Sequence, residues 1–294
     1  MYKTAYFPGC SLSSTAKEYD ISTKLICKDL GIELIEIPDW LCCGATSAHI
    51  TSELMAAVLP VINLLKVEKQ HLPVTAPCSA CFSRLKLADL AMKKDAQLRA
   101  DVAEVIGEEF KGTVDILHLW QVIEKYGNLK PKKELKGLKV ASYYGCLLTR
   151  PPEICQNERI EDPQFLDNMV SNLGSEAVKW AYKTECCGAG FSLTRKDIVL
   201  TLSQKILKEA KSSGADCIIV ACPLCHSNLD ARQQEMRLDF SLPILYFTQL
   251  IGLALGYGYR DLMLHKHFVE SKNLLQSKGL VSVQPSAISS QQKP

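Results

Sequence analysis

The segment Leu41-Cys42-Cys43-Gly44-Ala45 recurs later in the chain as Glu185-Cys186-Cys187-Gly188-Ala189. A Cys-x-x-Cys pair follows each copy at the same distance. Four pairs of cysteines therefore lie 144 residues apart: Cys42 and Cys186, Cys43 and Cys187, Cys78 and Cys222, and Cys81 and Cys225. Self-similarity at a fixed spacing indicates an internal duplication.

A fifth cysteine precedes each set. Cys10 ends the run Tyr6-Phe7-Pro8-Gly9-Cys10, and Cys146 ends the run Ser142-Tyr143-Tyr144-Gly145-Cys146. These two cysteines are only 136 residues apart, so the second copy holds eight more residues after its first cysteine. The segment Arg150-Pro151-Pro152-Glu153-Ile154-Cys155 is the predicted insertion. The repeated unit thus contains five cysteines.

Composition narrows the class of protein. The chain has 294 residues, and its 34 Lys and Arg nearly balance its 32 Asp and Glu, which argues against nucleic-acid binding. The first ten residues do not predict a secretory signal, and no stretch reaches the ~18 apolar residues of a membrane span, since Leu54 to Leu65 contains Pro60 and Asn63. We therefore expect a cytoplasmic protein. Because cytosolic thiols stay reduced, the 13 cysteines indicate metal binding or redox chemistry before disulfides.

Short β-rich runs alternate with helical stretches in both copies. The predicted strands cover residues 2–7, 32–37, 74–76, 138–144 and 217–221, and the predicted helices cover residues 15–30, 52–69, 79–94, 194–213 and 223–237. This alternation predicts an α/β fold of two similar Rossmann-like units with mostly parallel sheets, related by the duplication and a pseudo-twofold axis. Ligand sites in such sheets form beyond the carboxyl ends of the strands, where the ten repeated cysteines fall.

The domain organisation follows from the repeat. We assign residues 1–126 to the first unit and residues 138–267 to the second, with a lysine-rich segment at 127–137 expected to be a solvated linker. Pro243 to Gly256 is predicted to be an apolar helix of the second unit. Residues 268–294 form a C-terminal extension whose end, rich in Ser, Gln and Pro, is expected to be disordered.

Five thiols in each copy limit the choice of metal. Tetrahedral zinc needs four ligands, commonly two Cys-x-x-Cys pairs, and adjacent cysteines followed by glycine and a fifth cysteine fit that site poorly. Soft thiolates also select iron–sulfur clusters, normally with four cysteines each, so five suggest a cluster of unusual shape. We favour an iron–sulfur site, with zinc and a metal-free thiol relay as the alternatives.

The cysteine spacing is similar to that of the cysteine-rich CCG domain. The first copy has the pattern Cys-x31-Cys-Cys-Gly-x33-Cys-x2-Cys, at Cys10, Cys42, Cys43, Cys78 and Cys81. The second copy has x39 as its first spacing, at Cys146, Cys186, Cys187, Cys222 and Cys225. A chain of two complete copies resembles the catalytic B subunit of heterodisulfide reductase, from about Lys3 to His267. The resemblance implies two noncubane 4Fe-4S clusters, each held by one set of five cysteines.

The resemblance also implies an activity. A disulfide, either the coenzyme M–coenzyme B heterodisulfide or a related one, would be reduced to two thiols between the clusters, with no catalytic residues beyond the cluster ligands. Partners would be an iron–sulfur electron donor and a flavin subunit, similar to the C and A subunits of that reductase. Because CCG domains also occur in iron–sulfur subunits that oxidise lactate, glycolate or glycerol 3-phosphate, an electron-relay role is the alternative. A disulfide needs two electrons and a cluster passes one, so the duplication favours disulfide reduction.

Three cysteines stand outside the repeated register. Cys27 lies in a predicted helix and Cys217 opens a predicted strand, and both are expected to be buried as small apolar side chains. Cys155 lies in the predicted insertion and is expected to be a free thiol, with an extra redox role as the alternative.

Several cationic residues flank the cysteines. His49 and His226 are expected to be hydrogen-bonded structural histidines, with donation to cluster sulfur or binding of an anionic substrate as the alternative. Arg150 and Lys17 are further candidates for contact with a negatively charged substrate group, although a plain surface role is favoured. Two more histidines near the C-terminus are predicted to lie at a solvated end of the chain, His265 and His267.

Overall fold

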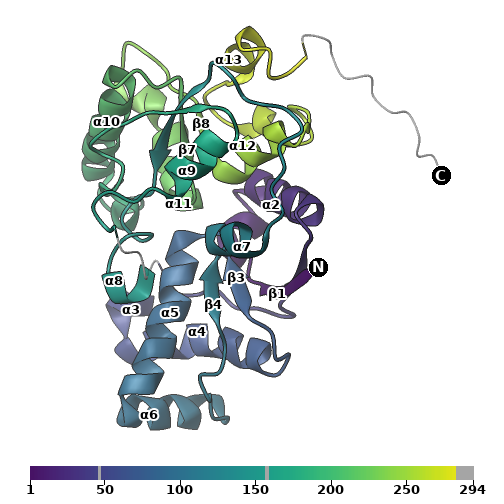
Figure 1. Ribbon diagram of the computed structural model, residues 1–294. Helices are drawn as coiled ribbons and strands as arrows, with labels where there is room; N and C mark the ends of the chain where they lie inside the picture. Colours follow the sequence, from purple (N-terminus) through teal and green to yellow (C-terminus); the bar gives the residue numbers. More distant parts are fainter. Residues whose placement is uncertain (46–47, 156–158, 283–294) are drawn as a thin grey trace, which may run out of the picture.

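Two parallel four-stranded sheets, one in each half of the chain, form the frame of the molecule (Figure 1). The computed structural model describes residues 1–45, 48–155 and 159–282. The strand order is β2-β1-β3-β4 in the first sheet and β6-β5-β7-β8 in the second, so the two sheets share one topology. The predicted α/β fold with two similar parallel-sheet units is therefore confirmed.

The first unit contains four strands and seven helices among its described residues. They are β1 (Tyr2–Tyr6), α1 (Gly9–Ser13), α2 (Lys17–Asp29), β2 (Ile32–Glu36), α3 (Ala48–Thr51), α4 (Glu53–Glu68), β3 (Val74–Ala76), α5 (Ser79–Lys94), α6 (Ala96–Ile106), β4 (Ile116–His118) and α7 (Leu119–Tyr126). Side-chain caps set several boundaries. The Ser52 hydroxyl accepts a hydrogen bond from the Met55 N–H at the start of α4, and Asp95 accepts one from Leu98 at the start of α6.

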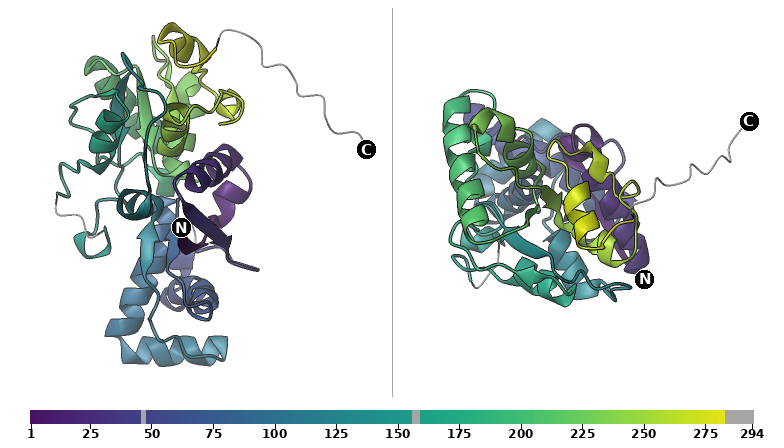
Figure 2. Two further views of the ribbon diagram at one scale, coloured as in Figure 1. Left: turned by 45° about the vertical axis from the view of Figure 1, so that its right-hand side comes forward. Right: turned by 90° about the horizontal axis from the view of Figure 1, so that it is seen from above.

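The second unit repeats this strand order, with a longer connection between its first two strands and a shorter one between its last two. Its elements are β5 (Lys139–Tyr143), α8 (Pro152–Cys155), α9 (Phe165–Asn172), β6 (Glu176–Ala177), α10 (Lys196–Ser212), β7 (Cys217–Val220), α11 (Pro223–Asp230), β8 (Ile244–Tyr246) and α12 (Phe247–Ala254), with 3-10 turns at Ala189–Phe191, Gln233–Met236 and Leu264–Lys266. Helix α13 (Lys272–Ser277) follows in the C-terminal extension. Helix α10 is amphipathic, since it buries Val199, Ile206 and Ala210 at helical spacing. In Figures 1 and 2, α10 and the C-terminal helices lie on opposite sides of the second sheet.

Several short elements were wrongly predicted or missed. The helix predicted over Pro243 to Gly256 is wrong at its start, because Ile244–Tyr246 pairs in parallel with β7 as strand β8 before α12 begins. Its counterpart β4 was not predicted at all. The helix predicted over 223–237 ends at Asp230 and is followed by a 3-10 turn. Strands of three apolar residues carry too little periodicity to be separated from a neighbouring helix.

The central strands lie inside the core. Every residue of β3 and of β7 is buried, as expected for parallel strands covered by helices on both faces. Their carboxyl ends therefore open directly onto α5 and α11, the helices that carry the Cys-x-x-Cys pairs.

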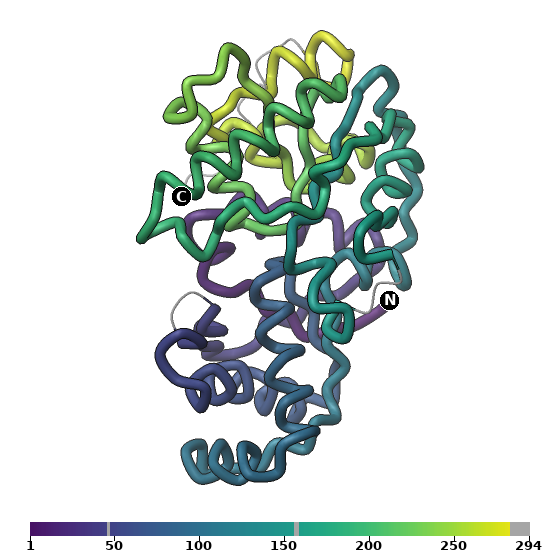
Figure 3. The backbone as a smooth tube through the Cα atoms, turned by 90° about the vertical axis from the view of Figure 1, so that its left-hand side faces the viewer, coloured from purple at the N-terminus to yellow at the C-terminus, as the bar shows by residue number. Residues whose placement is uncertain are grey.

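The two units pack against each other through helices from opposite ends of the chain. Helix α2 of the first unit packs against α12 of the second, and the same neighbourhood is visible in Figures 1 and 3. The rings of Tyr19 and Tyr246 stack with centroids 4.1 Å apart, and the Ser22 and Thr248 hydroxyls lie 2.7 Å apart. These contacts fix how the carboxyl ends of the two sheets face each other.

The segments at the end of each unit also contact the core. In the segment 127–137, the N–H groups of Lys132 and Lys133 donate to the Ala254 carbonyl. Leu275 and Leu280 are buried, so this part of the C-terminal extension packs on the second unit, while residues 283–294, for which disorder was predicted, lie outside the described residues.

The prediction that His267 is solvated is wrong. Its side chain is buried, with Gln249 3.0 Å from its Nε2 atom and His226 3.4 Å from its Nδ1 atom. His265 is exposed, as predicted. Within the described residues, no helix combines the length and apolar character needed to cross a membrane.

Candidate metal centre

The five cysteines of the first unit gather where three of its strands end. Cys10 lies in α1 directly after β1, Cys42 and Cys43 follow β2, and Cys78 and Cys81 lie at the start of α5 after β3. In the second unit the corresponding cysteines occupy the same places: Cys146 after β5, Cys186 and Cys187 after β6, and Cys222 and Cys225 at the start of α11 after β7. Shared sheet order is what brings cysteines distant in the sequence together.

Glycines let backbone and sulfur approach closely in both units. Gly9 has φ +67°, and a Cβ atom there would lie 2.9 Å from the Cys81 Sγ atom. Gly145 has φ +65°, and a Cβ atom there would lie 3.4 Å from the Cys225 Sγ atom. Since a side chain at Gly9 would press on the thiol, the glycine before the first cysteine is part of the site.

Pairs of sulfur atoms meet within each set. The Sγ atoms of Cys43 and Cys81 are 3.3 Å apart, and those of their counterparts Cys187 and Cys225 are 3.5 Å apart. In the second unit the Sγ atom of Cys146 also lies 3.8 Å from that of Cys186. All thirteen cysteines are free thiols.

Exposure is graded in the same way in the two sets. Cys43, Cys78 and Cys81 are buried and so are their counterparts, while Cys42 and Cys186 are exposed. The sets differ at the first cysteine, because Cys10 is exposed and Cys146 is half-buried. Each set therefore has a buried side against the sheet and an open side that a ligand or partner could reach.

Hydrogen bonds favour the thiolate at selected cysteines. Contacts with Cys42 and Cys81 lower the pKa of Cys43 to about 3, whereas the contact between Cys43 and Cys81 raises the pKa of Cys81. In the second unit, the contact with Cys146 and the N–H groups of Gly188 and Ala189 lower the pKa of Cys186 to about 6. Thiolates are the form of cysteine that binds metals.

Backbone N–H groups point at equivalent sulfur atoms in the two loops. The Gly44 N–H donates to the Cys42 Sγ atom at 3.5 Å, and the Gly188 N–H donates to the Cys186 Sγ atom at 3.3 Å. Such donors stabilise negative charge on sulfur, and hydrogen bonds of this kind tune iron–sulfur sites.

The two sets meet at the boundary between the units. Cys78 and Cys222 interact there. The interaction with Cys222 raises the pKa of Cys78. Interactions with Cys225, the stronger of the two, and with Cys78 lower the pKa of Cys222. The carbonyl preceding Cys222, that of Ala221, accepts a hydrogen bond from the Ser79 hydroxyl at 3.0 Å. The Tyr19 hydroxyl bridges the two units, since it lies 2.9 Å from the Pro77 carbonyl of its own unit, which precedes Cys78, and 3.4 Å from the Ala221 carbonyl of the second unit. The spacing between the two sets is thus fixed by direct hydrogen bonds.

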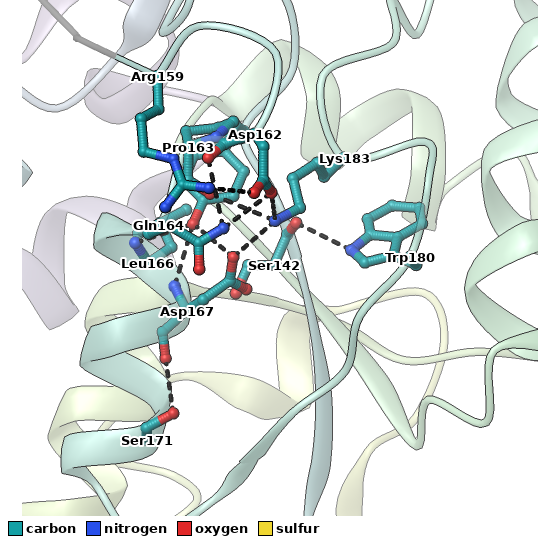
Figure 4. Close-up of polar contacts among 11 residues, drawn as sticks. Ser142, Arg159, Asp162, Pro163, Gln164, Leu166, Asp167, Ser171, Trp180 and Lys183 are labelled. Carbon is teal, nitrogen blue, oxygen red and sulfur yellow. Dashed lines mark hydrogen bonds and ion pairs between the residues drawn. The ribbon is translucent and has the colours of Figure 1, made fainter.

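A buried ion pair anchors the loop that carries Cys186 and Cys187. Figure 4 shows the Lys183 ammonium between two carboxylates, 2.9 Å from Asp167 and 2.9 Å from Asp162. The side chains of Lys183 and Asp167 are only 8% and 10% exposed. Burial alone would lower the pKa of Lys183, but the bonds to Asp167 and Asp162 outweigh it and raise that pKa. The Trp180 indole N–H also donates to the Ser142 carbonyl, which joins the loop to β5.

An amide side chain anchors the equivalent loop of the first unit. The buried Asn63 on α4 accepts a hydrogen bond from the Leu41 N–H at 2.8 Å and donates to the Leu41 carbonyl at 2.9 Å. Lys66, one turn further along α4, donates to the carbonyls of Pro38 and Asp39. Neither Asn63 nor Lys183 was singled out from the sequence, because both act through residues distant along the chain.

The cysteines outside the register lie apart from the two sets. Cys27 and Cys217 are buried in the core as predicted, and burial raises their pKa values. Cys155 is a free thiol as predicted; it is buried and lies 3.4 Å from the Leu147 carbonyl.

The basic residues near the cysteines differ in burial and in partners. His226 is buried, stacks on Tyr246 and lies 3.2 Å from the Ile244 carbonyl, as expected for a structural histidine. Arg150 pairs with Glu161 at 2.9 Å. Lys17 is exposed, as expected for a surface residue. His49 is also exposed and its side chain makes no hydrogen bond to another described residue, so the structural role predicted for it is wrong.

The donor set fits an iron–sulfur group. It consists of sulfur alone, partly buried beside helix N-termini and N–H donors, which suits a soft metal with anionic sulfide. Across residues 1–45, 48–155 and 159–282, no three Cys, His, Asp or Glu side chains surround a single point as ligands of one ion would.

Fold and site together define a class of duplicated α/β proteins with paired five-cysteine sites. The chain belongs to the CCG cysteine-rich domain family, which matches residues 4–86 and 140–230. The two matched segments contain the two sets of cysteines.

Several proteins are similar over nearly the whole chain. The 8-methylmenaquinol:fumarate reductase membrane anchor subunit of Wolinella succinogenes is 32% identical over 92% of this chain and 98% of its own length. The B subunit of the ferredoxin:CoB-CoM heterodisulfide reductase of Methanosarcina mazei is 30% identical over 94% of this chain and 96% of its own length.

A solved structure shares the fold. A hypothetical protein from Helicobacter pylori superposes with a TM-score of 0.76 at 14% identity, over 91% of this chain and 52% of that one. The chain therefore spans about half of that protein, and the likeness concerns the fold alone.

Proposed function

We propose that this chain is the disulfide-reducing subunit of a heterodisulfide reductase-like complex in the cytoplasm. Each set of five cysteines would hold one noncubane 4Fe-4S cluster: Cys10, Cys42, Cys43, Cys78 and Cys81 the first, and Cys146, Cys186, Cys187, Cys222 and Cys225 the second. The proposal is supported by the two complete cysteine sets and by the similarity to the B subunits of heterodisulfide reductases.

The meeting of the two sets at the unit boundary carries the proposal. Cys78 and Cys222 face each other, and Tyr19 and Ser79 of the first unit bond to the carbonyls that precede them. A disulfide has two sulfur atoms and takes up two electrons, so two equivalent sites facing one boundary match its chemistry. When bound, each cluster would supply one electron to one of the two sulfur atoms.

The chain's own residues would supply rigidity and charge rather than acid–base chemistry. Asn63 and Lys183 hold the two Cys-Cys loops, and the glycine N–H groups stabilise charge on Cys42 and Cys186. The exposed Cys42 and Cys186 mark the open sides, where substrate or an electron-donating partner would approach.

Substrate and partners are proposed by analogy with these relatives. The substrate would be the coenzyme M–coenzyme B heterodisulfide or a related disulfide, small or protein-bound. Electrons would come one at a time from an iron–sulfur subunit that is itself reduced by a flavin subunit.

A second candidate function is an electron relay without disulfide chemistry. The relative from Wolinella succinogenes is a subunit of a fumarate reductase, which favours such a role in part of the family. A relay would pass electrons through the clusters in a complex that oxidises quinol, lactate, glycolate or glycerol 3-phosphate.

Metal analysis tests whether the chain binds two iron–sulfur clusters. Protein purified without oxygen is expected to contain about eight irons and eight sulfides, as two four-iron clusters. About two zinc ions with no acid-labile sulfide would refute the iron–sulfur proposal.

Disulfide-dependent oxidation of reduced viologen separates the two functions. Cys42→Ala and Cys186→Ala should each abolish this activity, because each removes one of two required sites, while Cys27→Ala should retain it. Substantial activity in either variant, with the corresponding cluster absent, would exclude the paired mechanism and favour the relay.

A further inference from the structure

One helix position differs in charge between the two cysteine sites. Arg84 lies on α5 one turn after Cys81, and Asn228 lies on α11 one turn after Cys225. The two residues are 144 residues apart, the same spacing that relates the cysteines. They are therefore equivalent positions of the duplicated fold.

Asn228 places a neutral donor beside the second set. It is 1% exposed, and its Nδ2 atom lies 3.3 Å from the Cys187 carbonyl oxygen and 3.6 Å from the Cys187 Sγ atom. Its Oδ1 atom accepts a hydrogen bond from the Ser192 hydroxyl at 3.0 Å. The amide is thus fully used in holding the loop and the thiol.

Arg84 places a full positive charge beside the first set. Its position one turn after Cys81, equivalent to that of Asn228, puts its charge next to Cys43, the counterpart of Cys187, which is 2% exposed and lies 3.3 Å from Cys81. The positive charge of Arg84 accordingly favours the Cys43 thiolate and lowers its pKa. Burial lowers the pKa of Arg84, and Cys43 acts in the opposite direction, yet a guanidinium remains charged in proteins.

The Arg84 guanidinium has no other partner in the described part of the chain. It is half-buried and makes neither a hydrogen bond nor an ion pair with any described residue. The nearest acid on its own helix, Asp89, is bonded to Lys93 at 2.8 Å. A partly desolvated cation normally has an anionic partner, and here the neighbouring group is the set of thiols.

A fixed charge near an iron–sulfur cluster changes its reduction potential. Reduction adds one negative charge, which a nearby cation stabilises more than a neutral amide does. The protein's charges and hydrogen bonds are among the factors that set cluster potentials.

We propose that Arg84 is the electrostatic partner of the cluster in the first unit and makes it accept an electron at a higher potential than the cluster in the second unit. The inference rests on the proposed pair of clusters. Each reduction adds one electron to one cluster, supplied in the test by dithionite, and no bond is formed or broken. The first electron to reach the protein would then reside on the first unit.

A redox titration of the intact protein, followed by electron paramagnetic resonance, tests this assignment. The Cys43→Ala and Cys187→Ala variants assign each signal to its unit. Arg84→Gln should shift only the first-unit signal, to a lower potential, by at least a tenfold change in its ratio of reduced to oxidised cluster, which is 59 mV for one electron. Arg84→Lys keeps the positive charge, so its first-unit signal should stay close to the wild-type potential.

Lys86→Gln is the matched control. It removes the same charge from the same helix, but the charges that act on Lys86 are those of Asp115, Asp89 and Lys93 and not those of the cysteines. Both signals should keep their wild-type potentials in this variant.

Three results would overturn the inference. The first is an Arg84→Gln protein that has two intact clusters, unchanged potentials and unchanged disulfide affinity. The second is an Arg84→Gln protein that has unchanged potentials but a weaker affinity for the disulfide, which would assign Arg84 to substrate binding. If Arg84→Gln loses its cluster, a tenfold or larger change in Arg84→Lys would contradict a role of charge. Wild-type protein without iron and sulfide would instead refute the proposed function itself.

Discussion

The loops Leu41–Ala45 and Glu185–Ala189 carry the same Cys-Cys-Gly-Ala sequence but are held in place by different chemistry. Asn63 on α4 bonds both backbone groups of Leu41 in the first unit. A buried pair between Lys183 and Asp167 holds the loop of the second unit. The duplicated fold therefore keeps the positions of its sulfur atoms while the residues that support them differ.

The first cysteine of each set shows a second difference. Cys10 is exposed, whereas Cys146 is half-buried and precedes the insertion that forms α8. Helix α8 packs against α5 of the first unit, so this insertion crosses the boundary between the units. The comparison teaches that the two sites share ligands but differ in access, anchoring and charge.

Removing equivalent ligands should give the largest effects. Cys43→Ala and Cys187→Ala should each lose about half of the iron and destabilise their own unit, because metal binding and folding are coupled. Iron and sulfide analysis of anaerobically purified protein provides the measurement. Cys155→Ala, which removes a buried thiol outside the register, should keep the wild-type iron content. Full iron in either site variant would mean that the two sets are not equivalent.

The two side chains that anchor the Cys-Cys loops, Lys183 and Asn63, should differ in how much stability their removal costs. Lys183→Met leaves Asp167 buried without its partner and should lower the free energy of unfolding by ~3–5 kcal/mol. Asn63→Leu leaves two backbone groups of Leu41 unpaired and should cost ~1–3 kcal/mol. Urea denaturation of both variants gives the comparison. Equal costs would show that the ion pair contributes no more than the amide.

Acid should destabilise the second unit through His267. Burial lowers the pKa of His267 to about 4, below the ordinary value of 6.5. Between pH 6.5 and 4 the unfolded chain binds a proton that the folded chain does not, so stability is lost as the pH falls through this range, on the order of 2 kcal/mol. Denaturation of wild type and His267→Gln at pH 7 and pH 4.5 measures the difference. The variant should lose less stability, and an unchanged loss would exclude His267 as a source.

The smallest effects should come from the cysteines outside the register. Cys27→Ala in α2 and Cys217→Ala in β7 should each cost ~1 kcal/mol of packing and leave the iron content unchanged. Denaturation combined with iron analysis checks both statements. A Cys27→Ala protein depleted of iron as fully as Cys43→Ala would show that the register does not identify the ligands.

The sequence predicted what depends on neighbouring residues and on the repeat. Helix α5 was expected at 79–94 and spans Ser79–Lys94, and the strand expected at 74–76 is β3. The repeat of 144 residues also placed both cysteine sets at the carboxyl ends of strands. Applied to every position, the same register would have revealed the pair Arg84 and Asn228.

Long-range contacts could not be predicted in this way. The strand Ile244–Tyr246 exists because β7 pairs with it, and its three residues have no periodicity of their own. The burial of His267 depends on Gln249 and His226, and the anchoring of Cys186 depends on Lys183 meeting Asp167. Such pairings are decided by tertiary packing, which overrides local pattern.

The contact between α2 and α12 has a consequence for synthesis on the ribosome. Helix α2 is among the first elements to emerge, but Phe247–Ala254, which covers it, is among the last. At the usual speed of translation, Tyr19 and its neighbours would wait roughly 10–40 s for their partner. The nascent first unit therefore presents the uncovered buried face of α2, and its own cysteines, to chaperones and to the machinery that delivers iron before the second unit exists.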